Sequence, residues 1–361
     1  MSEKPKLESL REQIDALDLQ IQDLINARAA CAQQVAQVKT EAGERNDFYR
    51  PEREAEILRR VRERNAGPLD DTEMSRLFRE IMSACLALEK PLRIAYLGPE
   101  GTFTQAAALK QFGHSVQTVA LPAIDVVFRE VEAGDCNYGV VPIENSTEGV
   151  VNHTLDMFLR SPLRINGEVS LRIELHLLSR ESDLAAVQRV YAHQQALAQS
   201  REWLDANLPR AERIAVSSNG EAARRVGQEA GAAAVAGDAA AELYGLTRLA
   251  DRIEDEPGNT TRFLVVGSQS VGRSGQDKTS LLIAVNNKPG ALYRMLEPMA
   301  RHGLSMTRIE SRPSRRGIWD YVFFVDIEGH VEDAPVAEAL RELEQHASLF
   351  KVLGSYPRAV M

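Results

Sequence analysis

The sequence predicts three parts with different folds: an all-helical head, a two-lobed α/β domain and a ferredoxin-like α+β domain. Apolar residues at helical spacing fill most of the segment 1–91. Short β-rich runs then alternate with helical stretches over 92–268, and a strand–helix–strand–strand–helix–strand order follows over 279–361. At about 150 residues per domain, a chain of 361 residues is long enough for this organisation. The polar, Gly- and Ser-containing segment 268–278 predicts a flexible linker.

The sequence of the head predicts three helices, and the first of them is unusually long. Apolar residues recur every three or four positions from Leu7 to Val38, which predicts a helix of about 35 residues and about 50 Å. The rest of a small helical domain cannot cover that length, so the apolar stripe predicts a second copy of the same helix as its partner. Pro51 suits the start of a second helix, and Asp70 suits the cap of a third.

The α/β part is predicted from runs of β-branched and apolar residues separated by helical patterns. Its predicted strands are Arg93–Leu97, Tyr138–Ile143, Ser170–Leu178, Arg189–Ala192, Arg213–Val216 and Arg262–Val266. Its predicted helices include 103–112, 194–207 and 219–230. The last part predicts strands Thr279–Val285, Ser305–Ser311, Trp319–Asp326 and Phe350–Ser355, with helices over 290–302 and 334–346.

Composition excludes several classes of protein. With 43 basic and 52 acidic residues, the net charge of −9 argues against a broad nucleic-acid or anionic-membrane surface. Cys31, Cys85 and Cys136 lie far apart, so no zinc pattern or disulfide framework is expected, and the cytoplasm is the expected location. No signal peptide or run of about 18 apolar residues occurs. No dinucleotide fingerprint, phosphate loop or nucleophile elbow is present, so we expect chemistry without a cofactor or metal.

Two cations fall on the face of the first helix that should be buried. Arg28 continues the apolar register, and Lys39 lies about three turns further on the same face. A single cation there would reach water from the edge of a bundle. Two cations, together with Arg11, Glu54 and Glu89, instead predict a pocket for a small dicarboxylate, because clustered buried cations need an anion.

The motifs LREQIDALD, YRPERE and RLFREIMSACLALE, with the two cations, resemble the all-helical class of chorismate mutase. The resemblance implies an intertwined dimer. It implies that Arg28 binds one carboxylate of chorismate and that Arg11 of the partner subunit binds the other. Lys39 would then donate to the ether oxygen whose bond breaks, and Glu54 would bind the ring hydroxyl.

Three further positions in the head are carried over from the same resemblance. Arg50 would contribute partly through its main chain. Cys85 stands where the family often has Ser, and Glu89 stands where it often has Gln. An ionised Glu89 would repel the negative charge that develops on the ether oxygen, so we expect it to act protonated, with a pKa raised by burial.

The motifs IAYLGPEGTFTQAA, YGVVPIENSTEG and NTTRF resemble prephenate dehydratase over nearly all of 92–267. The resemblance implies a periplasmic-binding-like, two-lobed fold in which Thr261 protonates the departing ring hydroxyl. Arg262 would either pair a substrate carboxylate or brace the fold, and His193 is expected to be structural. The implied prephenate-binding residues are Thr102, Phe103, Glu144, Asn145, Ser146, Thr147, Gln199, Asn219, Thr261 and Arg262.

The residues themselves suggest how these motifs bind an acid. The backbone N–H groups of Thr102 and Phe103 would lie at the start of a helix that follows a glycine turn. A carboxylate is favoured at such a helix N-terminus. Asn145 and its neighbours follow an apolar strand, at the end where α/β sheets place their sites. Taken alone, this Asn-Ser-Thr sequence is more typical of an Asx turn. Asn219 would cap a helix and line the cleft.

The C-terminal motifs NNKPGALYRMLEPMARHG and IESRPSR resemble an ACT domain of the phenylalanine-responsive type. The resemblance implies that L-phenylalanine, as effector, binds between two such domains. The implied effector residues are Gly290, Ala291, Leu292, Glu310, Ser311, Arg312 and Pro313.

The sequence therefore predicts a bifunctional enzyme that converts chorismate to prephenate and prephenate to phenylpyruvate, as a homodimer or higher homo-oligomer. Two alternatives stay open on the residues alone. One is a non-catalytic sensor with a dimerising head, which would need neither the cation pair nor Thr261. The other is a mutase fused to a prephenate dehydrogenase, which would need a dinucleotide fingerprint.

Overall fold

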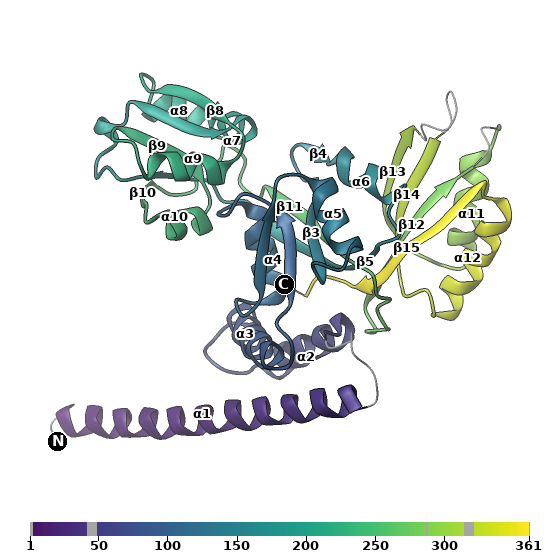
Figure 1. The fold of residues 1–361 in the computed structure, drawn as a ribbon, viewed down its shortest axis with the longest axis horizontal. Helices are drawn as coiled ribbons and strands as arrows, with labels where there is room; N and C mark the ends of the chain where they lie inside the picture. The colour runs from purple at the N-terminus through teal and green to yellow at the C-terminus, as the bar shows by residue number, and fades with distance from the viewer. Residues whose placement is uncertain (1–2, 42–48, 286–287, 314–320, 361) are drawn as a thin grey trace.

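The computed structural model describes residues 3–41, 49–285, 288–313 and 321–360. Its parts are a helical head, two α/β lobes and a C-terminal α+β domain, and the first lobe lies between the second lobe and the C-terminal domain (Figure 1). Trp319, the predicted start of a strand, falls outside the described residues. No helix in the described ranges is long and apolar enough to cross a membrane.

The head consists of α1 (Glu3–Glu41), α2 (Pro51–Arg64) and α3 (Asp71–Glu89), as predicted. The Asp70 side chain accepts from the backbone N–H groups of Thr72 and Glu73, which caps α3. The long α1 lies alongside the rest of the head and extends well beyond it (Figure 1). Its apolar stripe is uncovered in the single chain, with Leu7 51% and Leu24 70% exposed.

The first lobe is a six-stranded sheet flanked by helices. Its main order is β2-β1-β3-β11-β5, with β4 paired to β3. Strand β11 returns from the second lobe and runs antiparallel between β3 and β5, so residues far apart in the sequence become neighbours. The elements are β1 (Arg93–Leu97), α4 (Phe103–Phe112), β2 (Gln117–Leu121), α5 (Ile124–Glu132), β3 (Tyr138–Asn145), β4 (Gly149–Val150), α6 (Asn152–Phe158), β5 (Arg164–Arg172) and β11 (Thr260–Gly267).

The second lobe is a five-stranded sheet of order β10-β6-β9-β7-β8. The single predicted strand Ser170–Leu178 is wrong: the chain leaves β5 at Arg172 and enters the second lobe at His176. The predicted helix 194–207 is divided at Ser200. The elements are β6 (His176–Ser179), the 3-10 turn Leu184–Ala186, β7 (Arg189–His193), α7 (Gln194–Gln199), α8 (Arg201–Asn207), β8 (Glu212–Val216), α9 (Asn219–Val226), β9 (Ala232–Ala236), α10 (Asp238–Tyr244) and β10 (Thr247–Ala250).

The C-terminal domain has the predicted β-α-β-β-α-β order, with strands arranged β13-β14-β12-β15. Both faces of its sheet are buried. Leu281 and Ile283 belong to the core under the domain's own helices, whereas Leu282 and Phe324 belong to the core of the first lobe. The elements are β12 (Asp277–Ala284), α11 (Ala291–Arg301), β13 (Met306–Pro313), β14 (Tyr321–Glu328), α12 (Ala334–His346) and β15 (Leu349–Pro357).

The segment 268–278 is anchored rather than flexible, which corrects the predicted linker. The Gln269 amide donates to the Tyr49 carbonyl oxygen, 3.2 Å away, and the Val271 carbonyl oxygen lies 3.0 Å from His330 Nε2. The Asp277 carboxylate accepts from the backbone N–H and hydroxyl of Ser274. The small polar residues therefore form turns held by hydrogen bonds between the parts of the chain.

Candidate active sites

A cavity of about 650 Å³ lies between the three helices of the head. We call it the head cavity. Every predicted chorismate-binding residue except Arg11 lines it. Those residues are Arg28, Lys39, Arg50, Glu54, Cys85 and Glu89. Phe112 of α4 also lines it, so the first lobe supplies part of its wall, which the sequence did not predict.

The two cations of the apolar stripe face this cavity from a half-buried position. Glu89, at the end of α3, lies close enough to both to be affected by their charge. Burial raises the pKa of Glu89, and the positive charges of Lys39 and Arg28 offset only part of that rise. The direction agrees with the prediction of a protonated Glu89.

Glu54 has a partner within the protein. Its carboxylate is buried, lies 3.6 Å from Arg79 Nε, and has a pKa raised by burial and lowered in part by Arg79. Glu52 lines the same cavity and belongs to the same YRPERE motif. The motif alone could not distinguish the two acids, and the role of Glu54 as the ligand of the ring hydroxyl stays a prediction.

Arg11 is exposed on α1 and does not line the head cavity. It lies about 25 Å before Arg28 along the helix axis. It therefore cannot reach this cavity from its own helix. Supply of Arg11 by a second copy of the chain stays a prediction, and the uncovered stripe on the same helix is the surface that such a copy would cover.

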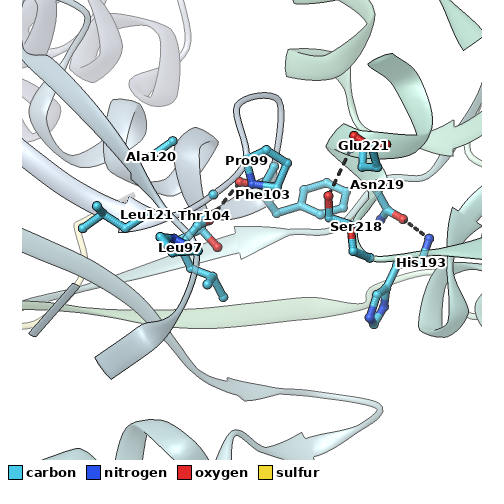
Figure 2. Close-up of a pocket in the computed structure, with 14 residues that line it drawn as sticks. Leu97, Pro99, Phe103, Thr104, Ala120, Leu121, His193, Ser218, Asn219 and Glu221 are labelled. Carbon is cyan, nitrogen blue, oxygen red and sulfur yellow. Dashed lines mark hydrogen bonds between the residues drawn. The ribbon is translucent and has the colours of Figure 1, made fainter. Parts of the chain in front are cut away.

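A second site lies between the two lobes, in two adjoining cavities that we call the cleft. The larger, about 690 Å³, is lined by Thr102 and Phe103 of the first lobe and by Ser218 and Asn219 of the second (Figure 2). The smaller, about 150 Å³, is lined by Asn145, Gln199 and Thr261, among others. Phe103, Thr104, His193 and Asn219 line both cavities.

A closed hydrogen-bond network surrounds Thr261. The Asn145 amide donates to Thr261 Oγ1 at 2.8 Å and to Asn259 Oδ1 at 2.7 Å. Asn259 donates to Gln199 Oε1, and Gln199 donates to Thr147 Oγ1, each at 3.1 Å. Asn259 is 3% exposed and was missed from the sequence, although it stands directly before the threonines of the NTTRF motif.

The Thr261 hydroxyl is set up to donate a hydrogen bond. A hydroxyl has one proton to donate and two lone pairs that accept. One lone pair accepts from Asn145, and no residue in the described part of the chain accepts the proton. Because Thr261 lines the cleft, its O–H can donate to a molecule bound there.

The Asn-Ser-Thr sequence forms an Asx turn and also holds a site residue. Asn145 Oδ1 accepts from the backbone N–H groups of Thr147 and Glu148, both at 3.0 Å. Ser146 and Thr147 do not line the cleft. Ser146 Oγ accepts from the Thr260 N–H and ties β3 to β11, while Thr147 supports Asn145 and Gln199.

Glu144 and Arg262 do not face the cleft, which corrects their assignment as prephenate-binding residues. Side chains alternate between the faces of a strand, so each points away from its cleft-facing neighbour, Asn145 or Thr261. The Glu144 carboxylate lies 3.2 Å from Arg308 Nε of the C-terminal domain. Arg262 donates to Glu168 at 2.9 Å and is therefore bracing the fold, the second of its two predicted roles.

Close backbone packing brings the two lobes together at the cleft. Gly101, with φ at +80°, allows the turn that leads into α4, and Thr102 caps α4 by accepting from Gln105 N–H. A Cβ added at Gly220 would lie 2.4 Å from the carbonyl oxygen of Glu100. Only glycine therefore permits α9 to approach the first lobe so closely.

His193 and Asn219 link two elements of the second lobe. The Asn219 side chain accepts from His193 N–H at 2.9 Å (Figure 2). His193 Nδ1 accepts from Gln195 N–H at 3.3 Å. This agrees with a structural His193. Ser218, not Asn219, caps α9, because its hydroxyl accepts from Glu221 N–H. Asn219 nevertheless lines the cleft as predicted.

The predicted effector residues occupy two places in the C-terminal domain. Gly290, with φ at +75°, precedes α11, and Leu292 is 45% exposed on its first turn. Glu310–Pro313 lies on β13, an edge strand. Arg312 points toward the first lobe, where it donates to Asp156 at 2.8 Å, so its side chain is already engaged.

No group of three or more His, Cys, Asp or Glu side chains in the described ranges could hold a metal ion. Family models match the three parts of the chain in order. Chorismate mutase type II matches residues 10–90, prephenate dehydratase matches 94–271, and the ACT domain matches 279–345. The chain is therefore a multidomain enzyme with a chorismate mutase head, a prephenate dehydratase body and an ACT domain.

Relatives with this full organisation are similar over the entire chain. A bifunctional chorismate mutase/prephenate dehydratase of Stutzerimonas stutzeri is 58% identical, and one of Pseudomonas aeruginosa is 55% identical, over 100% of both chains in each case. The chain belongs to this family of bifunctional chorismate mutase/prephenate dehydratases. Membership removes the sensor and the dehydrogenase fusion as alternatives.

A solved structure is similar to the last two domains. It is the prephenate dehydratase of Arthrobacter aurescens in complex with L-Phe, with a TM-score of 0.69 and 35% identity. The similarity covers 74% of this chain and 90% of that one.

Proposed function

We propose that the head cavity converts chorismate to prephenate and that the cleft converts prephenate to phenylpyruvate, water and carbon dioxide. We also propose that the chain acts as a homodimer and that L-phenylalanine inhibits the second reaction through the ACT domain. The observation that supports this assignment most directly is the presence of two separate cavities with different linings. Arginine, lysine and glutamate side chains line the head cavity, whereas neutral hydrogen-bonding groups surround Thr261 in the smaller cavity of the cleft.

The first reaction needs charge placement but no covalent chemistry. The rearrangement breaks an ether C–O bond and forms a C–C bond within one molecule, so the enzyme must hold a compact conformer and stabilise the charge that develops on the oxygen. Arg28 binds one carboxylate, and Arg11 of the partner subunit binds the other. Lys39 and protonated Glu89 donate to the ether oxygen from the end of the cavity where they lie together.

The second reaction turns a dianion into an aromatic monoanion. The bond from the ring to its carboxylate breaks, and its electron pair enters the ring as carbon dioxide leaves. The ring C–O bond breaks at the opposite carbon, and the departing hydroxide takes the Thr261 proton to become water. Thr261 then regains a proton from solvent, so one proton is consumed in each turnover. A threonine hydroxyl is a weak acid, so aromatisation supplies most of the driving force.

The hydrogen-bond network supports this role for Thr261. Asn145 donates to the oxygen, which fixes the hydroxyl so that its proton points to an acceptor in the cleft. The same donation stabilises negative charge on that oxygen as the proton leaves. Backbone N–H groups at the start of α4 remain the proposed site for a substrate carboxylate.

A complementation assay tests the shared head cavity. Arg11→Ala and Arg28→Ala should each lose mutase activity when purified alone. Mixed, unfolded and refolded together, they should recover about a quarter of the wild-type activity, because a mixed dimer has one cavity with both arginines. Each variant refolded alone is the control. No recovery in a mixture that does contain mixed dimers would contradict supply of Arg11 by a partner.

A coupled assay tests the order of reactions and the effector. Purified enzyme given chorismate should form prephenate first and phenylpyruvate second, and added L-phenylalanine should slow only the second step. L-tyrosine, which differs by one hydroxyl, is the matched control. Equal inhibition by both amino acids, or none by phenylalanine, would contradict the proposed effector.

A further inference from the structure

Four charged side chains meet where the ACT domain packs on the dehydratase domain. Glu144 of β3 and Arg262 of β11 are cross-strand partners on one side, and Arg308 of β13 and Asp326 of β14 are cross-strand partners on the other. Across the interface, Glu144 lies 3.2 Å from Arg308, and Arg262 lies 2.8 Å from Asp326. Each charge thus has an opposite charge beside it and another facing it. We call these four residues the charge quartet.

The Arg262 half of the quartet is largely buried and hydrogen-bonded. The Arg262 side chain is 17% exposed and that of Asp326 is 6% exposed. Arg262 also donates to the Tyr356 hydroxyl at 3.2 Å, and Asp326 accepts from the Ser280 hydroxyl at 2.6 Å. Buried charges are tolerated only when such partners are in place, so the two sheets are held in one relative position.

The quartet is one residue away from the catalytic groups on both strands. Asn145 follows Glu144, and Thr261 precedes Arg262. Asn145 and Thr261 are themselves cross-strand partners joined by a 2.8 Å hydrogen bond. Consecutive Cα atoms are about 3.8 Å apart, so a displacement of the backbone at Glu144 or Arg262 also displaces the neighbouring cleft residue.

The ACT side of the quartet is equally close to the predicted effector residues. Arg308 and Glu310–Pro313 lie on the same strand, β13. Arg312, four residues further along the strand, also bonds to the dehydratase domain, through Asp156. A displacement of this edge strand on effector binding would therefore act first on the ion pairs that it makes across the interface.

We propose that Glu144 and Arg262 are positioning residues through which the ACT domain sets the hydrogen bond between Asn145 and Thr261. The charge quartet is then the route by which an amino acid bound to the ACT domain changes the dehydratase rate. The second statement rests on the proposed response to phenylalanine. The first does not, because it concerns the enzyme without effector.

Two variants break the quartet from the ACT side, away from the cleft. In Arg308→Gln and Asp326→Asn, the dehydratase kcat should fall severalfold while KM stays within about twofold, because the change acts on Thr261 rather than on substrate binding. Calorimetry should find phenylalanine still bound to both variants. The concentration that gives half-inhibition should nevertheless rise by about tenfold or more.

Lys351→Gln is the matched control. Lys351 of β15 also joins the two domains, by donating to the carbonyl oxygens of Phe158 and Ser161 at 3.1 and 2.6 Å, and neither acceptor lies on β3 or β11. It should keep the wild-type kcat and the wild-type inhibition. If Lys351→Gln loses as much kcat and as much inhibition as Asp326→Asn, the quartet only holds the two domains together, and the proposal is overturned.

If Asp326→Asn does not fold, the ion pair between Glu144 and Arg308 provides the test. Glu144→Gln, Arg308→Gln and their double variant should lose similar amounts of inhibition, with no further loss in the double variant. If these variants bind phenylalanine and are inhibited as strongly as the wild type, the proposed coupling is wrong. If the wild-type enzyme does not bind phenylalanine, the proposed effector is wrong, and kcat alone decides: equal values in Arg308→Gln and Lys351→Gln overturn the positioning role.

Discussion

The two active sites differ in how much of each a single chain supplies. In the cleft, Asn145, Gln199, Asn259 and Thr261 come from separate segments yet close their hydrogen bonds on one another. In the head, Arg28 and Lys39 line the cavity from a helix whose apolar stripe is uncovered in the single chain, with Leu24 70% exposed. The hydrogen bonds around Thr261 thus close within one chain, whereas the proposed chorismate site takes Arg11 from a second copy.

The chemistry of each reaction accounts for the difference. A site that delivers one proton needs neutral groups fixed at short distances, which a folded sheet provides. The first reaction also develops negative charge on the ether oxygen, so its site needs donors and cations there as well as at the carboxylates, and cations collected inside one small helical domain would repel one another. In the proposed dimer, Arg11 of a second subunit completes the positive charge only when the long helices of the two subunits pack on one another. Changes to assembly and changes to the cleft should therefore have separate consequences.

The largest expected effect is in the cleft. Thr261→Val keeps the shape of the side chain but removes the hydroxyl, so dehydratase kcat should fall by about 100-fold or more, the usual contribution of a positioned proton donor. Prephenate should accumulate from chorismate at the wild-type rate. Loss of chorismate measures the first reaction, and formation of phenylpyruvate measures the second.

Thr261→Ser is the matched control, because it restores a donor at the same position. It should recover a substantial part of the activity. A Thr261→Val enzyme that retains more than about half of the wild-type kcat would exclude Thr261 as the proton donor.

The next effect concerns the assembly. Leu17→Asp introduces a charge into the exposed stripe of α1, where Leu17 is 55% exposed. Burying that charge against a second helix is costly, so the head should dissociate and mutase activity should fall by about tenfold or more. Dehydratase activity should stay within about twofold of the wild type. Light scattering after gel filtration and the two assays measure this.

Asn26→Asp is its control, because it adds the same charge on the opposite face of α1. Position 26 is exposed in the single chain. It should leave both activities and the oligomeric state unchanged. Equal loss of mutase activity in the two variants would mean that charge on α1, rather than contact through the stripe, is responsible.

Local sequence patterns were sufficient for elements that lie wholly within one lobe or domain. The helix predicted at 334–346 is α12 with the same bounds, and the strand predicted at Arg93–Leu97 is β1. Periodicity failed where tertiary context decides. The apolar run through Ser170–Leu178 continues across the change from one lobe to the other, and no local signal marks that crossing.

The sites divide in the same way. Motifs selected the right segments, but they could not decide which face of a strand meets the cleft. Glu144 and Arg262 stand beside cleft residues, so strand alternation turns them to the opposite face, where they pair with Arg308 and Asp326 of the ACT domain. Phe112 lines the head cavity from another domain, which one-domain reasoning could not foresee. Chemistry was therefore easier to predict than orientation.

A smaller effect is expected where the lobes touch. Gly220→Ala places a Cβ 2.4 Å from the Glu100 carbonyl oxygen, so the lobes must separate slightly at the cleft. Dehydratase kcat/KM should fall by about tenfold with mutase activity unchanged. Gly227→Ala, at the other end of α9, is the control, since its added Cβ meets only the carbonyl oxygens of that helix. Similar loss in both would point to helix stability instead.

The smallest effect is a change in pH dependence at the head cavity. Burial raises the pKa of Glu89, so its protonated form persists above the usual carboxyl range and is lost as pH rises through the raised value. If Glu89 donates to the ether oxygen, mutase kcat/KM should decline toward alkaline pH in the wild type. It should stay level in Glu89→Gln, whose amide donates at every pH.

Glu54 makes this comparison necessary, because burial also raises the pKa of that carboxyl group. A decline that survives in Glu89→Gln but disappears in Glu54→Gln would assign the titration to Glu54 and remove Glu89 as donor. The dehydratase profile of each variant serves as an internal control, since the cleft contains neither acid. If the pH profile of the mutase changes and that of the dehydratase does not, the two sites respond independently to pH as well as to changes in assembly.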